Sequence, residues 1–320
     1  MARPASIGLS RQLPSLPPGA RACLGALAGL ALLEWAWAGA AGIGFGNLHR
    51  VGLMALALGV IAYVAAARVR TRLGARIARV AAAYALWVLL TASGAILTYL
   101  CAHSRVPLCD AALLRIDQAL GFDWPAWYSY VAAHRSLHWV LAVAYASGGY
   151  QISAAIIYLA SLEDTRPGLE FWWTSLLSAV LTALVSGIFP ALGSFAYFHI
   201  AQAQAVHLPH LLALRDGSVA LFNIDQMEGI VTMPSYHTVT ALLLIYVFRH
   251  QRHLRLPVLV LNVLMLASTP SMGGHYVADM LGGLAVTAVS IWLVRRGLRW
   301  RARVWAGARW SALAPGQVLD

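Results

Sequence analysis

Two histidines and one aspartate stand where apolar stretches begin, and their spacing could support phosphate chemistry. His237 lies in MPSYHTVTALLL (233–244), and His275 and Asp279 lie in GGHYVADMLGG (273–283). The four-residue spacing places His275 and Asp279 on one face of a helix. A carboxylate that accepts a hydrogen bond from one imidazole nitrogen fixes the tautomer and makes the other nitrogen more basic. We therefore predict that Asp279 orients His275.

The residues around each histidine favour a helix start that can hold an anion. Thr232 or Ser235 can cap a helix, and Pro234 suits its first turn. Free backbone N–H groups and the helix dipole attract negative charge at such an end. The glycines before His275 let the backbone approach a ligand closely. We predict that the residues flanking the two histidines bind the substrate: Ser235, Tyr236, Gly273 and Gly274.

Two histidines, one carboxylate and two helix N-termini that point at one pocket suit the transfer of a phosphoryl group. We predict that His275 attacks phosphorus and that His237 protonates the leaving oxygen. The phosphohistidine would then pass its phosphoryl group to water or to an alcohol, and no metal or other cofactor is required. The alternatives are two interfacial histidines, a structural ion pair between His275 and Asp279, or a metal site.

The loop 199–234 is the other place where a metal could bind. It contains several residues of metal-binding type: His199, His207, His210, Asp216, Asp225 and Glu228. HLPH (207–210) could supply two ligands, but polar side chains are ordinary in a loop. We therefore expect no metal there.

The composition indicates a membrane protein. Of the 320 residues, 60% are hydrophobic and only 11% are charged, whereas soluble domains carry roughly 25% charged residues. Apolar stretches of about the length needed to cross a bilayer recur along the chain. They lie near 22–45, 51–67, 80–102, 136–161, 171–198, 235–248, 256–271 and 275–294. We predict an all-α, polytopic membrane bundle with about eight transmembrane helices.

The distribution of arginine predicts how the bundle is oriented in the cell membrane. The chain has no lysine, and 18 of its 23 arginines fall on one side if eight spans alternate from a cytoplasmic N-terminus. Both termini would then be cytoplasmic, and both histidine motifs would lie at the outer face. The net charge of +11 is thus a topology signal, and we expect no nucleic-acid partner. The outer loop 103–135, rich in aromatic residues, predicts an interfacial helix that acts as an anchor or a lid.

Two other features leave alternatives open. Cys101 and Cys109 would face an oxidising compartment, where they could form a disulfide or remain free thiols. Glu34 lies in the middle of the first apolar stretch, where it would be neutral or paired across helices.

MPSYHT and GGHYVADMLGG resemble the second and third signature motifs of the type-2 phosphatidic acid phosphatase superfamily, which shares its core with the vanadium haloperoxidases. The resemblance implies that His237 is the acid, that His275 is the nucleophile and that Asp279 orients it. GIFPALGSFAYF (187–198) and RIDQALGFDWP (115–125) are similar to the branch that contains the inositol phosphorylceramide synthases and the related sphingomyelin synthases.

The resemblance covers roughly 110–290 and implies a core of six helices. Together with the apolar pattern it predicts four parts. Residues 1–21 would be a disordered cytoplasmic segment and 22–79 two additional transmembrane helices. Residues 80–294 would form the six-helix catalytic core, and 295–320 a basic cytoplasmic tail.

The chain departs from the phosphatase branch in the cations that would bind phosphate. That branch has a first motif with lysine and arginine, but FPALGSFAYF holds no cation, and Thr269 stands where the third motif usually has arginine. A phosphate diester carries less charge than a monoester, so the missing cations favour the transfer of a phospholipid headgroup. Arg215, in the outer loop, is the best candidate to replace them.

These observations predict an integral-membrane lipid phosphotransferase or phosphatase that acts on phospholipid or isoprenoid phosphate esters. Its partners would be the bilayer, the lipid phosphate and, for a transferase, an alcohol acceptor such as inositol, ceramide or diacylglycerol. The alternative is a non-enzymatic lipid transporter or carrier in which His275 and Asp279 relay protons.

Overall fold

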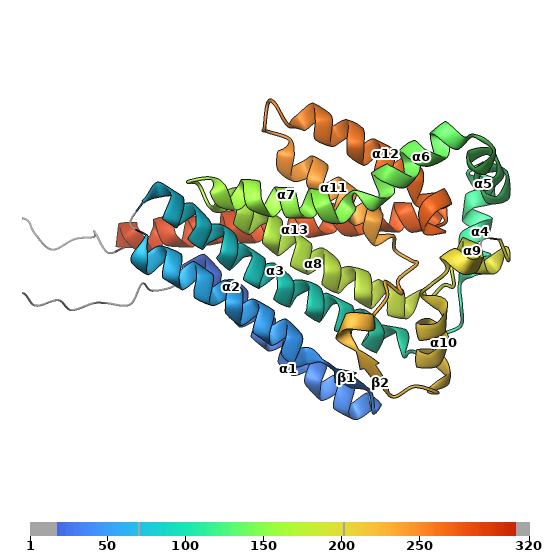
Figure 1. Cartoon of the computed structure of the whole chain (residues 1–320), viewed down its shortest axis with the longest axis horizontal. Coiled ribbons are helices and arrows are strands. Elements are labelled where there is room, and N and C mark those ends of the chain that lie inside the picture. Colours follow the sequence, from blue (N-terminus) through green and yellow to red (C-terminus); the bar gives the residue numbers. More distant parts are fainter. Residues whose placement is uncertain (1–17, 70, 201, 312–320) are drawn as a thin grey trace, which may run out of the picture.

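The structure is a computed structural model that describes residues 18–69, 71–200 and 202–311, and helices dominate it (Figure 1). The long apolar helices are α1 (Pro18–Ala41), α2 (Leu48–Arg68), α3 (Arg72–Ala102), α8 (Arg166–Ile188), α12 (Arg255–Gly273) and α13 (Val277–Ser311). Three shorter apolar helices are α6 (Arg135–Ala146), α7 (Gly148–Ser161) and α11 (Tyr236–Phe248). The remaining elements are β1 (Gly44–Gly46), α4 (Asp110–Ala119), α5 (Trp124–Ala133), α9 (Ser194–Tyr197), η1 (Gln202–Gln204), α10 (Leu208–Asp216), β2 (Leu221–Asn223) and η2 (Ile224–Gln226).

In the described part of the chain, 6 helices are long and apolar enough to cross a membrane. Helices α6 and α7 make a seventh span if the bent pair counts as one, and α11 is a shorter apolar helix of 13 residues. Large apolar side chains cover the outside of the bundle; Leu53 and Leu56 on α2 are 62% and 63% exposed. Such a surface suits lipid rather than water. The prediction of an all-α, polytopic membrane bundle is confirmed.

The fourth and fifth apolar stretches differ from the prediction. Helices α6 and α7 meet at an angle of 43°, at the sequence Ser147-Gly148-Gly149, and small residues of this kind are a common cause of helix kinks. Helix α8 ends at Ile188, well before the predicted end at 198. Pro190 disfavours helix at the residue before it, and Gly193 has a positive φ of 89°. The stretch 189–193 therefore leaves the span and becomes a loop.

The predicted boundaries near the two termini also need correction. Helix α1 begins at Pro18, so residues 18–21 are helical rather than disordered, whereas 1–17 lie outside the described residues. The basic tail was predicted to begin at residue 295. Helix α13 continues past this point as far as Ser311, so residues 295–311 are helical. In the loop 103–135, the structure has two helices, α4 and α5, in place of one. Cys101 and Cys109 are free thiols.

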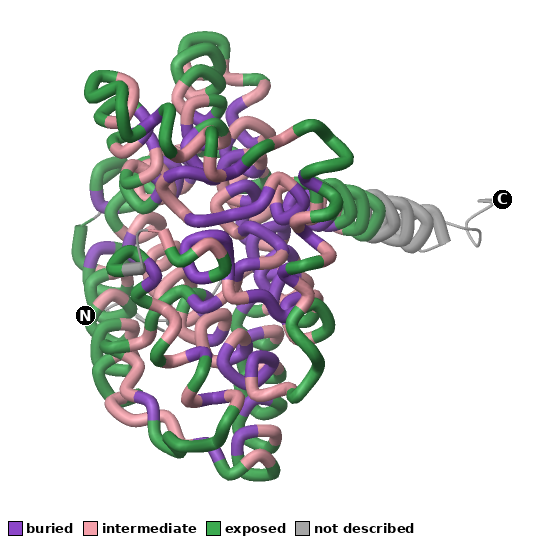
Figure 2. The backbone as a smooth tube through the Cα atoms, turned by 90° about the vertical axis from the view of Figure 1, so that its right-hand side faces the viewer, coloured by how far each residue is buried: buried purple, intermediate pink, exposed green. Residues whose placement is uncertain are grey.

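The short elements gather at one end of the bundle, the right-hand end in Figure 1. Helices α3 and α8 end there, α13 begins there, and α4, α5, α9 and α10 lie around them. Strand β1 pairs in parallel with β2, which ties the turn between α1 and α2 to the segment before α11. Both histidine motifs belong to this end. Figure 2 shows that buried residues concentrate inside the bundle and exposed residues around it.

Helices α11 and α13 approach each other closely where the two motifs meet. The Ser235 N–H donates to the Asp279 carbonyl oxygen at 3.0 Å. A Cβ at Gly283 would lie 2.7 Å from the Ser235 carbonyl oxygen, so only glycine allows this approach. Below the contact, Val239 and Leu243 of α11 pack in a cluster with α7, α8 and α13. The start of α11 is thereby held against the first turns of α13.

Candidate active site

His275 lies in the short link between α12 and α13, and Asp279 lies in the first turn of α13. Gly274 ends α12 with a φ of 65°, a left-handed conformation that suits glycine. The Nδ1 atom of His275 is 3.2 Å from Oδ2 of Asp279, and the same oxygen accepts a hydrogen bond from the Tyr276 N–H at 2.8 Å. Both side chains are buried. Because Nδ1 is engaged by the carboxyl group, Nε2 is the ring nitrogen that faces away from Asp279.

His237 is the second residue of α11. Ser235 caps this helix, and its hydroxyl oxygen accepts a hydrogen bond from the Thr238 N–H at 3.4 Å. The predicted place of Pro234 needs correction, because it precedes the cap instead of lying in the first turn. The rings of His237 and His275 have centroids 6.3 Å apart and meet edge to face. The two imidazoles are therefore close enough to act on one phosphate group.

Tyr145 of α6 positions the His237 ring. The two rings stack with centroids 4.0 Å apart, and the Tyr145 hydroxyl is 3.1 Å from Nδ1 of His237. Nε2 of His237 is therefore the nitrogen left for proton transfer. Nothing in the local sequence pointed to this tyrosine, since its partner is 92 residues away. A Cβ at Gly273 would lie 2.6 Å from the tyrosine hydroxyl and 2.8 Å from Cδ2 of His275, so Gly273 gives both rings room.

Both histidines line a cavity of about 670 Å³. Tyr236, Gly273 and Tyr145 line it as well. From there the cavity continues into the bundle along helices α3, α7 and α8, beside residues that include Leu90, Gly94, Gly148, Ile152 and Ala179. No arginine is found among the described residues that line it. The two histidines therefore share a cavity whose lining is largely apolar.

Three residues that were predicted to contact the substrate do not line the cavity. The Arg215 guanidinium donates to the carbonyl oxygens of Ser104 at 3.0 Å and Val106 at 2.7 Å, and Arg215 is not among the lining residues. The role of phosphate-binding cation that we predicted for it is therefore not supported, because its donors face the loop before α4. Ser235 is fully buried as a helix cap. Gly274 shapes the turn but does not line the cavity.

The surroundings of His275 favour its neutral form. Burial lowers the pKa of His275 from 6.5 to about 4, and a hydrogen bond with the backbone of Thr232 opposes this shift. A neutral imidazole keeps the lone pair that a nucleophile needs. Burial also lowers the pKa of His207, which lines the same cavity.

Two buried carboxyl groups of α4 hold the segment that carries His275. Asp117 accepts hydrogen bonds from the N–H groups of Val277 and Ala278, both at 2.9 Å, and so caps the start of α13. Burial raises the pKa of Asp117, and these N–H groups oppose the shift. Asp110 accepts from the backbone N–H of Leu192 and Gly193 at 2.9 and 3.0 Å.

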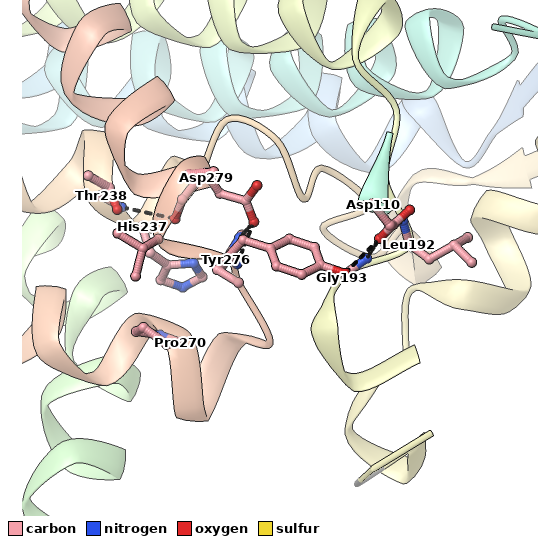
Figure 3. A network of polar contacts seen from close by, with 12 residues as sticks. Asp110, Leu192, Gly193, His237, Thr238, Pro270, Tyr276 and Asp279 are labelled. Atoms are coloured by element: carbon pink, nitrogen blue, oxygen red, sulfur yellow. Dashed lines mark hydrogen bonds and ion pairs between the residues drawn. The ribbon is translucent and has the colours of Figure 1, made fainter. Parts of the chain in front are cut away.

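Tyr276 connects Asp110 to the carboxyl group of Asp279. Its hydroxyl donates to Asp110 at 3.1 Å, and its backbone N–H donates to Asp279 (Figure 3). The roles of Asp110 and Asp117 were not predicted from the sequence, although their seven-residue spacing places them on one helix face. Asp117 also lies within RIDQALGFDWP, a stretch quoted above for its resemblance alone. The network indicates that α4 is part of the site's framework rather than only an interfacial anchor.

We expect Asp117→Ala to lower turnover at least tenfold, because the α13 start would lose its cap and His275 would lose its position. The unpaired N–H groups should also cost about 1–3 kcal/mol of unfolding free energy. Asp123→Ala is the matched control, since Asp123 caps α5 through the Ala126 N–H at an exposed position. Chemical denaturation and steady-state kinetics in detergent check both values. Unchanged turnover in a folded Asp117→Ala variant would contradict the positioning role.

The loop residues considered as metal ligands are dispersed. Within the described residues, no group of three or more His, Cys, Asp or Glu could hold a metal ion. His207 lies 2.9 Å from the Leu192 carbonyl oxygen through Nε2, and His210 contacts the Tyr99 hydroxyl. Asp225 forms an ion pair with Arg50. The HLPH segment therefore has structural partners, and only His207 of its two histidines lines the cavity.

The fold and the site together define a polytopic membrane protein in which His237 and His275 line one cavity beside the buried Asp279. A family model described as the PAP2 superfamily matches residues 111–293, more than half of the chain. The chain belongs to this superfamily, and the resemblance noted from the motifs is confirmed at that level. Comparisons with curated proteins and with solved structures gave no match. The matched range includes His237, His275 and Asp279.

Proposed function

We propose that the protein is an integral-membrane phosphotransferase or phosphatase for lipid phosphate esters and that it works through a phosphohistidine on His275. The observation that carries the proposal is the geometry of the histidine pair. Asp279 engages Nδ1 of His275, Tyr145 engages Nδ1 of His237, and the two rings lie 6.3 Å apart in one cavity. Each histidine thus keeps one nitrogen for the reaction.

The reaction would proceed in two steps. In the first, Nε2 of His275 attacks phosphorus, the bond between phosphorus and the ester oxygen breaks, and protonated His237 gives its proton to the leaving oxygen. In the second, His237 takes a proton from water or an alcohol, whose oxygen attacks phosphorus and breaks the P–N bond. Asp279 stabilises the positive charge that develops on His275 in both steps.

The shape of the cavity supports a lipid substrate. Its reactive end lies at the histidines, and its apolar end runs along α3, α7 and α8 within the apolar bundle. A hydrocarbon chain fits such a lining, whereas a fully hydrated phosphate ester would gain little from it. The substrate class is a phospholipid or an isoprenoid phosphate. The arginine distribution favours a site on the outer face, with both termini cytoplasmic.

His207 is our candidate for the cationic contact that Arg215 does not make. It lines the cavity, and its contact with the Leu192 carbonyl oxygen uses Nε2, which leaves Nδ1 for another partner. A phosphate oxygen nearby would favour protonation of His207, because opposite charges stabilise one another. One such histidine supplies less positive charge than the lysine and arginine of the phosphatase branch, so a diester suits the cavity better than a monoester. This favours transfer to an alcohol, as in the synthase branch.

An acceptor test distinguishes transfer from hydrolysis. The purified protein is incubated with labelled phosphatidic acid, undecaprenyl diphosphate or phosphatidylinositol, with and without diacylglycerol, ceramide or inositol, and free phosphate and new lipid are both measured. We expect a new lipid that depends on the acceptor. Phosphate release without an acceptor would make the protein a hydrolase. No turnover of any phosphate ester would contradict the proposal and favour the transporter alternative.

The low pKa of His275 predicts an acidic limit to catalysis. Because its pKa falls from 6.5 to about 4 on folding, His275 stays neutral at pH 5 to 6, and kcat/KM should decline only as the pH approaches about 4. The same shift makes the fold less stable as the pH falls from 6.5 toward 4, since the unfolded state then binds more protons. Rates must therefore come from samples shown to be folded. A decline centred near 6.5 would contradict a buried, neutral nucleophile.

A further inference from the structure

A second cavity lies on the opposite side of α3 from the catalytic one. It has a volume of about 840 Å³ and is formed by α1, β1, the start of α2 and one face of α3. Leu89, Ala92, Ser93 and Ile96 of α3 line it, whereas the neighbouring residues Leu90, Thr91, Gly94 and Ala95 line the catalytic cavity. One stretch of one helix thus forms a wall shared by both spaces. We call the second cavity the α1–α3 groove.

Glu34 is the one acidic side chain in the α1–α3 groove among its described lining residues. The residue is only 3% exposed, and its Oε2 accepts a hydrogen bond from the Ser93 hydroxyl at 3.1 Å. Its Oε1 is buried and has no hydrogen-bond partner. A carboxyl oxygen in an apolar, membrane-spanning region needs a partner, because no water is there to supply one. The unpartnered oxygen is therefore evidence for a ligand.

The rest of the groove is apolar and made largely of small residues, such as Ala28, Ala31 and Gly39. It lies between helices that are long and apolar enough to cross a membrane, so bilayer lipid is the surrounding medium. A hydroxyl group can donate to a carboxylate or accept from a carboxylic acid, and it suits Glu34 in either form. A charged headgroup would lose its hydration in this setting. The ligand should therefore combine a hydrocarbon chain with an uncharged hydroxyl group.

We propose that the α1–α3 groove binds a lipid alcohol, whose hydroxyl group forms a hydrogen bond with Oε1 of Glu34 after rotation of the carboxyl group turns this buried oxygen toward the groove. The site is separate from the catalytic cavity and does not depend on the proposed phosphoryl transfer. It places an alcohol-bearing lipid one helix away from the histidines. It also gives a role to the first two apolar helices, which lie outside the range matched by the PAP2 family model.

The structure offers a matched pair of glycines to test the groove. Gly52 of α2 lines it, and a Cβ there would meet nothing within 4 Å. Gly59 of the same helix also has open space at its Cβ, but it does not line the groove. Gly52→Leu should therefore fill the groove without disturbing the fold, and Gly59→Leu is its control.

The experiment uses the full chain in nanodiscs with a photoreactive, alkyne-tagged diacylglycerol, and labelled peptides are mapped by mass spectrometry. We expect labels on α1 to α3. Labelling should fall about fivefold in Glu34→Leu, as for loss of a hydrogen bond worth about 1 kcal/mol, and at least as much in Gly52→Leu, whose side chain would occupy the groove. Gly59→Leu and Glu34→Gln should label like the wild type, because an amide can also donate and accept. Labelling should persist in His275→Ala, which separates this site from catalysis.

A deoxy form of the same probe, with hydrogen in place of the hydroxyl group, completes the test. We expect it to label the groove about fivefold less, for the same reason. Equal labelling by the deoxy probe would show an apolar groove without selectivity for an alcohol and would overturn the proposal. Labelling that Gly52→Leu does not change would overturn it as well, because the lipid would then lie elsewhere.

Discussion

Replacing His275 with alanine is expected to reduce turnover of lipid phosphate esters by on the order of 10³-fold or more, as for loss of a covalent nucleophile. The side chain is buried in the cavity, its Nδ1 is engaged by Asp279, and burial keeps it neutral. No other described histidine combines these features. Turnover per folded protein in detergent, with thermal unfolding measured in parallel, checks this prediction.

The control for this variant is His134→Ala. His134 directly follows α5 and is exposed, and its side chain contacts the carbonyl oxygen and the ring of Tyr130. It should retain turnover near that of the wild type. A folded His275→Ala protein that turned over its substrate as fast as the control would show that His275 is not the nucleophile.

The second large effect concerns His237 and depends on the leaving group. His237→Gln should slow the cleavage of an alkyl phosphate ester by about 10²–10⁴-fold, the usual contribution of a general acid. It should slow the cleavage of a p-nitrophenyl ester much less, because that leaving group needs no proton. Comparing the two esters in the wild type and the variant isolates the proton transfer.

Tyr145→Phe gives a graded companion to this test. It removes the hydroxyl group that contacts Nδ1 of His237 but keeps the stacked ring. The variant should show the same leaving-group pattern as His237→Gln with a smaller loss. If His237→Gln slowed both esters equally, His237 would bind or position the substrate rather than act as the acid.

The local parts of the site could be predicted from the sequence. His275 and Asp279 are four residues apart, so helical geometry alone brings them together, and Ser235 is a strong capping residue just before His237. The convergence of the two motifs was expected from the direction of their spans. The two motifs lie side by side because α11 packs closely against Gly283 of α13.

The parts that could not be predicted depend on long-range contacts. Tyr145 reaches His237 from another span, and Asp117 caps α13 from 160 residues away in the chain. Arg215 looked like the missing cation because of its residue type, but its donors are used by carbonyl groups of the loop before α4. Spacing and composition carry no information about which distant backbone groups a side chain will meet.

The central claim is that the phosphoryl group passes through His275, and trapping that intermediate tests it most directly. Wild-type protein is mixed with a labelled p-nitrophenyl phosphate ester and quenched in alkali, where phosphohistidine survives, and the modified peptide is identified by mass spectrometry. His237→Gln is used alongside, since slower second-step attack should let the intermediate accumulate. Phosphate found on His275 in both proteins, and in neither when His275 is alanine, is the predicted result. Rapid turnover with no phosphorylated histidine, or with the label on another residue, would contradict the account.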